Sequence, residues 1–172
     1  MRGKLFGGSK QPKLVEQAEA AGEIGKEATR TQESWKCLLV PAVDAPYSMR
    51  SLEVAFRLTQ GTDATVQLAF VIAVPRSLPL EAALPESEML AATTLRDAQE
   101  AARAYKVPVE AFVHRTRNAP DGILKLIAQE KTDLLVLGGR PDAIRGLPRE
   151  LLRELFRRAP CEVVLDYIAD EK

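Results

Sequence analysis

Short apolar runs alternate with amphipathic stretches from residue 35 onward, and this alternation predicts the fold. Consecutive apolar side chains are typical of strands that are buried on both faces of a sheet. Five such runs indicate strands at residues 37–43, 64–74, 107–114, 133–139 and 161–168. Between them, apolar residues recur at the spacing of an amphipathic helix. Strands that alternate with helices predict one α/β domain over residues 35–172, a doubly wound five-stranded parallel sheet with helices on both faces.

Turn and cap residues mark where the helical stretches begin and end. Gly61 ends the stretch that carries Met49, Leu52 and Phe56. Residues 118–121, Asn-Ala-Pro-Asp, indicate a helix start, with proline in the first turn and an acid near the positive end of the helix dipole. The last helix opens after Pro148, and we expect four of its residues to point inward: Leu151, Leu152, Leu155 and Phe156.

Residues 1–34 differ in composition from the rest of the chain. The first thirteen residues carry four basic side chains and no acid. Residues 14–30 show only a weak apolar stripe, and two interior glycines cost a helix roughly 1 kcal/mol each relative to alanine. We expect a flexible arm with a marginal helix. Such an arm is either a disordered extension or a tether that docks on a partner.

Composition excludes several classes of function. Lys and Arg number 24, as do Asp and Glu, so the formal net charge is zero and does not favour nucleic acid or an anionic membrane. No apolar run reaches the roughly 18 residues that span a bilayer. The basic N-terminus lacks the apolar stretch of a signal peptide. We therefore expect a cytoplasmic protein with no membrane span and no nucleic-acid partner.

Few residues offer metal or redox chemistry. Cys37 and Cys161 each open an apolar run and are far apart in the sequence, which favours two buried thiols over a disulfide or a metal pair. The single histidine, His114, excludes a His-rich zinc site. We predict neither a metal site nor catalytic residues.

Four stretches resemble the universal stress protein family, in the order and spacing of that family. Residues 38–44, Leu-Leu-Val-Pro-Ala-Val-Asp, are similar to its first strand with the terminal aspartate, and residues 64–74 to its second strand. Residues 132–138, Thr-Asp-Leu-Leu-Val-Leu-Gly, are similar to its fourth strand and the glycine that follows. Residues 155–165 resemble its last helix and strand, joined by an Ala-Pro-Cys turn. The resemblance covers about residues 35–168.

The resemblance implies the strand order 3-2-1-4-5. It also implies a homodimer built by antiparallel pairing of the last strand, because an apolar edge strand otherwise tends to aggregate. The candidate dimer edge consists of Val163, Val164, Leu165, Asp166 and Tyr167. In this order Ser48 follows a central strand and His114 ends an edge strand, so a Ser–His catalytic pair is disfavoured.

Nucleotide-binding members of the family carry Gly-x-x-Gly, nine further residues, and then Gly-Ser or Gly-Thr after the fourth strand. Glycines let backbone amides and a helix N-terminus approach the phosphates. Here the first part is Gly138-Gly139-Arg140-Pro141, so a proline without an amide hydrogen replaces the second glycine. Counting back from Ala159-Pro160, the later Gly-Ser position falls on Arg149-Glu150, so the loop is one or two residues shorter than in the family, and a carboxylate at this position would repel phosphate. The family motif is therefore degenerate in this chain.

Two interpretations of this loop stay open. In the first, ATP does not bind and the pocket is filled or reshaped. In the second, the side chains of Arg140, Arg145 and Arg149 contact phosphate, and Gly146 supplies a tight turn. The same arginines could instead form a solvated surface with the acids that interleave with them.

If ATP or AMP binds, the resemblance places Asp44 and Val71 near the base and Gly138 and Gly139 near the ribose and phosphates. Val43 ends the same strand as Asp44 and belongs to this candidate site. Ligands of doubly wound sheets bind beyond the carboxyl ends of the strands, which is where these residues fall.

The sequence thus favours a non-enzymatic, homodimeric regulatory protein. We expect its adenine-nucleotide site to be degenerate, so that ATP binding is weak or absent and no cofactor is certain. A first alternative is a docking module for a protein partner such as a transporter, through residues 1–34 or the proline-rich loop at residues 75–80. A second alternative is a weak nucleotide hydrolase.

Overall fold

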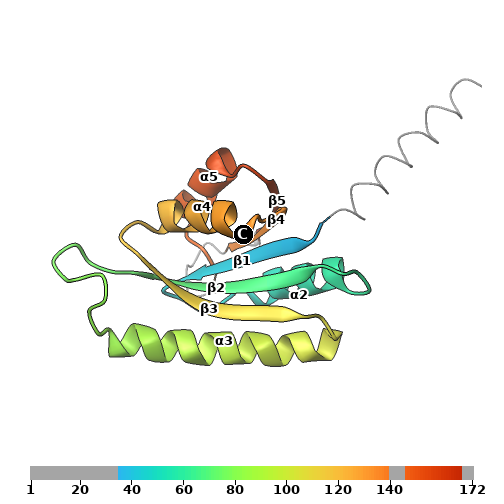
Figure 1. The fold of residues 1–172 in the computed structure, drawn as a ribbon, viewed down its shortest axis with the longest axis horizontal. Coiled ribbons are helices and arrows are strands. Elements are labelled where there is room, and N and C mark those ends of the chain that lie inside the picture. The colour runs from blue at the N-terminus through green and yellow to red at the C-terminus, as the bar shows by residue number, and fades with distance from the viewer. Residues whose placement is uncertain (1–34, 140–145, 168–172) are drawn as a thin grey trace, which may run out of the picture. The chain divides into compact units, whose positions relative to one another are not determined.

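The computed structural model describes residues 35–139 and 146–167, so the expected arm at residues 1–34 lies outside the described residues. Strands and helices alternate along the described chain (Figure 1). In chain order they are β1 (Cys37–Val43), α2 (Met49–Thr59), β2 (Thr65–Ala73), α3 (Pro85–Tyr105), β3 (Val109–Thr116), α4 (Ala119–Glu130), β4 (Leu134–Gly139), α5 (Arg149–Arg158) and β5 (Glu162–Tyr167).

Five parallel strands form one sheet in the order β3-β2-β1-β4-β5, which confirms the predicted fold class and strand order. β1 is central, because Leu38 aligns with Val66 of β2 on one side and with Leu134 of β4 on the other. β4 pairs in turn with β5 along its whole length. The two edges of the described sheet are therefore β3 and β5.

Helices cover both faces of the sheet, as predicted (Figure 1). α2 and α3 pack on one face together with Leu38 and Val40, whereas α4 and α5 pack on the other face together with Leu39. These three side chains of β1 are fully buried. Because successive residues of a strand point to opposite faces, the unbroken apolar run of β1 supplies both halves of the core.

The third strand begins two residues later than the sequence pattern predicts. α3 ends at Tyr105, and the next residue, Lys106, takes a left-handed conformation with φ of 55°. The amide of Val107 donates to Ala102 O of the helix end, and Pro108 has no amide hydrogen. The apolar residues 107 and 108 therefore close the helix, and strand pairing starts at Val109.

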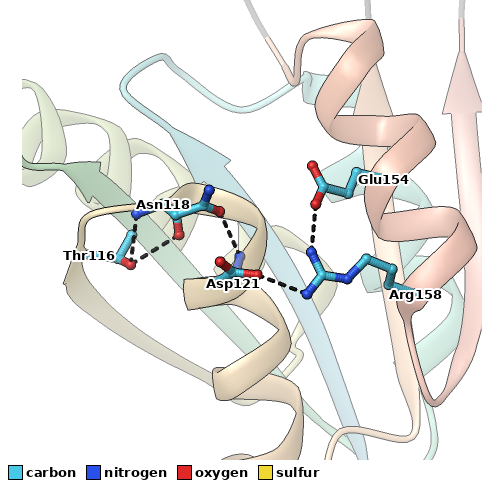
Figure 2. Close-up of polar contacts among 5 residues, drawn as sticks. All are labelled: Thr116, Asn118, Asp121, Glu154 and Arg158. Carbon is cyan, nitrogen blue, oxygen red and sulfur yellow. Dashed lines mark hydrogen bonds and ion pairs between the residues drawn. The ribbon is translucent and has the colours of Figure 1, made fainter.

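Asp121 and Arg158 join the start of α4 to the end of α5 (Figure 2). The Asn118 side chain accepts a hydrogen bond from the Asp121 amide at 3.1 Å, so the predicted helix start is confirmed. Arg158 donates to Asp121 at 2.8 Å and to Glu154 at 2.5 Å. These exposed contacts place one arginine of α5 between two carboxylates and join the end of α5 to the start of α4.

Phe156 is exposed, so the prediction that it points inward is wrong. Leu151, Leu152 and Leu155 are buried as predicted, but 61% of Phe156 remains accessible. α5 lies over the edge of the sheet, and no described strand beyond β5 extends the sheet under this flank of the helix. The aromatic ring therefore lies past the core rather than in it.

Within residues 35–139 and 146–167, no helix is long and apolar enough to cross a membrane. The same ranges contain no group of three or more histidine, cysteine, aspartate or glutamate side chains that could hold a metal ion.

Candidate functional site

The switch point of the sheet lies between β1 and β4. The chain leaves β1 toward α2 on one face, and it leaves β4 toward α5 on the other face. Doubly wound folds bind ligands at this position, beyond the carboxyl ends of the two strands. The loops that follow β1 and β4 therefore form the candidate site.

Asp44 lies directly after β1 and closes the end of the neighbouring strand. Its backbone takes a left-handed conformation with φ of 45°, its amide donates to Val71 O at 3.2 Å, and its carboxylate accepts from the Ala73 amide at 3.2 Å. Partial desolvation raises the pKa of the Asp44 carboxyl, and the hydrogen bond from Ala73 opposes that rise. The carboxylate is thus both a cap for β2 and the exposed polar group of this strand end.

Val43 and Val71 lie side by side on β1 and β2. Val71 is fully buried in the core beneath α4 and α5, whereas Val43 is half-buried. The carbonyl of Val71 already accepts the Asp44 amide. The structure therefore brings the three residues together, with Asp44 as the only one whose side chain is polar and exposed.

Gly138 and Gly139 allow two helices to approach the end of β4. A Cβ on Gly138 would lie 2.5 Å from Ser51 Oγ and 2.8 Å from Ser48 Cβ, both at the start of α2. A Cβ on Gly139 would collide with Leu152 of α5. The absence of side chains at these glycines is therefore used for helix packing, and buried side chains occupy the space beside them.

Gly146 connects the two loops of the candidate site. Its amide donates to Pro46 O at 2.9 Å, and the next amide, that of Leu147, donates to Gly138 O at 2.7 Å. Gly146 has φ of 83°, and a Cβ on it would lie 2.6 Å from Gly138 O. The two amides that precede α5 are thus bound to protein carbonyls rather than directed at a ligand.

The first turn of α5 contains Arg149 and Glu150, which occupy the position of the family's Gly-Ser pair. Pro148 occupies the N-cap without a side-chain cap, and Glu150 lies in the first turn. The guanidinium of Arg149 lies over the Tyr167 ring, 5.8 Å from its centroid, in a cation–π arrangement. Arg149 therefore stacks on the end of β5, and the other two arginines of the predicted anion site, Arg140 and Arg145, lie outside the described residues, as does Pro141.

The candidate dimer edge is strand β5. Val163 and Val164 are half-buried against opposite halves of the core, and Leu165 is 43% exposed. Asp166 points toward α2, where its Oδ1 lies 3.3 Å from Arg50 Nε and its Oδ2 is buried without a hydrogen-bond partner. Tyr167 lies beneath Arg149. The strand thus presents one backbone edge and one apolar side chain to solvent.

Two features of the loops were not anticipated from the sequence. Ser48 and Ser51 pack against Gly138, with Ser51 Oγ donating to Ser48 O at 2.8 Å. On the β3 side, Arg115 donates to the carbonyl oxygens of Leu80 and Ala82 and to Glu88. The proline-rich loop is therefore fastened to β3 by an arginine whose only sequence signal was its position at a strand end.

A parallel α/β sheet with its candidate site at the β1–β4 switch point defines a class of nucleotide-binding folds. The chain belongs to the Universal stress protein family, whose model matches residues 34–165. This result confirms the family resemblance stated from the sequence.

Solved structures with the same fold include several family members. A universal stress protein from Archaeoglobus fulgidus has a TM-score of 0.61 at 18% identity, covering 76% of this chain and 93% of its own. The universal stress protein of that organism in complex with dAMP has a TM-score of 0.59 at 14% identity, covering 76% and 97%. A family protein from Arabidopsis thaliana with AMP bound has a TM-score of 0.55 at 14% identity, covering 78% and 92%. The curated proteins contain no match.

Proposed function

We propose that this chain is a non-enzymatic regulatory protein of the universal stress type, with an adenine-nucleotide site in which ATP binding is weak or absent. The observation that carries the proposal is the hydrogen bond from the Gly146 amide to Pro46 O, 2.9 Å long. A phosphate between the loops after β1 and β4 would need such amides as donors. Because Gly146 and Leu147 already donate to protein carbonyls, neither of these two amides is free to donate to a phosphate.

Two further features oppose a triphosphate. Pro141 replaces a glycine of the family motif and has no amide hydrogen. Glu150 carries its negative charge in the first turn of α5, where an anion would otherwise be stabilised by the helix N-terminus. The structures of relatives carry AMP and dAMP, nucleotides with a single phosphate. We therefore propose that any adenine nucleotide bound here is recognised through its base and ribose, beside Asp44.

Homodimerisation through β5 is part of the proposal. The exposed edge of β5 and the 43% exposure of Leu165 support it, because a second copy of the strand would cover both. Pairing two β5 strands antiparallel joins two sheets into one, with a two-fold axis through the contact. Sedimentation equilibrium tests it directly: we expect twice the mass of one chain, and a monomer at micromolar concentration would exclude it.

The geometry argues against a Ser–His catalytic pair, which supports the proposal of a non-enzymatic role. Ser48 is 2% exposed and forms the N-cap of α2, so its hydroxyl is not presented to a substrate. His114 lies on β3, separated from β1 by the whole width of β2. A Ser–His pair needs hydrogen-bond distance, which this arrangement does not offer. The cytoplasmic location is likewise proposed, and two free thiols, Cys37 and Cys161, fit a reducing compartment.

Mass spectrometry of the denatured protein tests the nucleotide proposal. The protein is purified without added nucleotide, denatured, and the released small molecules are quantified against the protein. We expect no stoichiometric ATP. An adenine nucleoside monophosphate, if present, should disappear in Asp44→Ala and persist in the control Asp63→Ala, which alters an exposed acid at the opposite end of the sheet. Stoichiometric ATP in the wild-type protein would contradict the proposal.

A further inference from the structure

A buried glutamine meets two glutamates near the amino-terminal ends of β2 and β3. Gln67 of β2 lies beside Glu110 of β3 in the sheet, and Glu130 ends α4, which packs on the same face. The side-chain nitrogen of Gln67, Nε2, donates to Glu110 Oε2 at 3.4 Å and to Glu130 Oε2 at 3.1 Å. We call these three side chains the Gln67 cluster.

The amide oxygen of Gln67 has no partner. The residue is only 5% exposed, and its Oε1 is buried without a hydrogen bond to any described residue. A buried carbonyl oxygen without a partner is costly, and native structures seldom leave one. Because Oε1 and Nε2 belong to one amide group, a half-turn about the last side-chain torsion brings the oxygen to the position that the nitrogen holds between the carboxylates.

After that half-turn, three oxygen atoms converge with the spacing of metal ligands. The separations of 3.1 and 3.4 Å between the amide position and the two carboxylate oxygens carry over. Neighbouring oxygens around Ca²⁺, bound at about 2.4 Å in a flexible geometry, lie about 2.8–3.4 Å apart. Around octahedral Mg²⁺, bound at about 2.1 Å, they lie about 3.0 Å apart. Both separations are within the calcium range and longer than the magnesium value.

The charges around the cluster favour a cation. Two carboxylates approach one amide, and the negative end of the α4 dipole lies beside them, with no basic residue in the last turn of the helix. Among the ion pairs between described residues, none includes Glu110 or Glu130, although exposed Lys131 follows Glu130 in the chain. Both glutamates are exposed, so a hydrated ion reaches them directly from solvent.

We propose that the Gln67 cluster binds a divalent cation of the size of Ca²⁺. Oε1 of Gln67 and the carboxylates of Glu110 and Glu130 supply the protein ligands, and water completes the six to eight oxygens that calcium takes. Two carboxylates form a weak set, so we expect a Kd of about 10⁻⁴–10⁻³ M. With only two acidic side chains, the cluster differs from the groups of three that the described ranges lack.

The cation would join three elements at one end of the sheet. It would link β2, β3 and the last residue of α4 at the amino-terminal ends of the strands, opposite the switch point. The site is therefore independent of the proposed nucleotide site. It was not predicted from the sequence, because its three ligands come from three separate elements.

Calcium titration tests the proposal. The full chain is treated with EDTA, dialysed and titrated with CaCl₂ by calorimetry, while NMR follows the side-chain amide signals of Gln67. We expect one saturable site, at least fivefold weaker binding of Mg²⁺, and a shift of the Gln67 signals as Nε2 leaves the carboxylates. No saturable binding up to 10 mM CaCl₂, calcium binding that leaves the Gln67 amide signals unchanged, or tighter binding of Mg²⁺ would each overturn the proposal.

Variants separate the ligands from the fold. Glu110→Gln and Glu130→Gln alter exposed side chains, and each should weaken calcium binding at least tenfold with an unchanged circular dichroism spectrum. Gln67→Glu places a third carboxylate at the same length and should bind calcium at least tenfold more tightly. Glu100→Gln, which alters an exposed acid of α3, is the matched control and should change nothing. If both exposed variants bind calcium like the wild type, the Gln67 cluster is not the site.

Discussion

The amide of Gly146 donates a hydrogen bond to the carbonyl oxygen of Pro46, at 2.9 Å. This bond joins the loop after β4 to the loop after β1 across the switch point of the sheet. In a fold that places ligands at this position, backbone amides of these two loops are candidate donors to a phosphate. The contact therefore holds the two loops together through an amide that is not available to a phosphate.

Substituting Gly146 tests how tightly the two loops are held. Gly146→Ala forces a side chain onto a residue with φ of 83° and a Cβ 2.6 Å from Gly138 O. We expect a loss of about 2–5 kcal/mol in the free energy of unfolding, from backbone strain and overpacking together. The matched control is Gly61→Ala, which has φ of 76° and nothing within 4 Å, and should cost only about 1–2 kcal/mol. Equal losses in urea denaturation would refute the close contact.

Asp44 should make stability depend on pH in a defined direction. Desolvation raises the pKa of this carboxyl, so the folded state holds its proton more tightly than the unfolded state. The contribution of Asp44 is therefore most favourable below the unfolded-state pKa and declines as pH rises through the folded-state pKa. Asp44→Asn removes the charge, and the amide oxygen can still accept from Ala73. Relative to the wild type, the variant should gain stability as pH rises through the titration range of this carboxyl, and a constant difference would contradict this account.

Arg115 should control the order of the proline-rich loop. It donates to Leu80 O and Ala82 O and pairs with Glu88 at 2.9 Å. Removing the side chain in Arg115→Ala leaves those carbonyls without this donor, and each lost charged hydrogen bond costs about 1.5–3 kcal/mol at most. We expect roughly tenfold faster amide exchange in the loop, with little change in α4 and α5. Arg96→Ala is the control, and unchanged exchange in the Arg115 variant would show that the loop holds its own structure.

Glu88 supplies an independent readout of the same contact. The hydrogen bond from Arg115 is the main cause that lowers the pKa of the Glu88 carboxyl, with the Leu84 amide contributing less. In Arg115→Ala the pKa of Glu88 should move back up toward its ordinary value, as followed by carboxyl-carbon chemical shifts. A pKa that does not move would mean that the Leu84 amide alone holds the carboxylate.

Truncating Leu155 or its neighbour Phe156 in α5 to alanine should lower the free energy of unfolding by very different amounts. Leu155 is fully buried, and Leu155→Ala should cost about 2–5 kcal/mol by removing core contacts and leaving a cavity. Phe156 is 61% exposed, so Phe156→Ala should cost less than about 1 kcal/mol. Urea denaturation of the two variants compares them directly. A large loss at Phe156 would mean that the ring is covered in the folded protein.

The fold was predictable because its signals are local. The runs in β1 and β4 are apolar on every position, which identifies strands buried on both faces, and Asn118 with Pro120 marks a helix start. The exposure of Phe156 was not predictable, because helical periodicity gives the apolar side of a helix but not where the sheet beneath it ends. The late start of β3 depends on the conformation of Lys106, which periodicity does not encode.

The candidate site was predictable only in part. Asp44, directly after β1, and the two glycines that end β4 could be located because the carboxyl ends of these apolar strands meet at one edge of the sheet. That these glycines make room for helix packing could not be predicted from the sequence. The packing of Ser51 on Gly138 and the hydrogen bond between Gly146 and Pro46 both join segments that are far apart in the chain. The sequence does not distinguish a glycine that makes room for a phosphate from a glycine that makes room for a packed helix. The nucleotide-binding roles of Asp44, Val71 and the arginines stay predictions.

Calorimetric titration of ATP tests the central claim most directly. The wild-type protein is compared with a variant that restores the residue types of the family motif in the shorter loop, Pro141→Gly with Arg149→Gly and Glu150→Ser. We predict no saturable heat from the wild type at millimolar ATP, and binding at least tenfold tighter in the restored variant, because an amide donor returns and a carboxylate leaves the first turn of α5. Micromolar ATP binding by the wild-type protein, abolished by Asp44→Ala, would contradict the account.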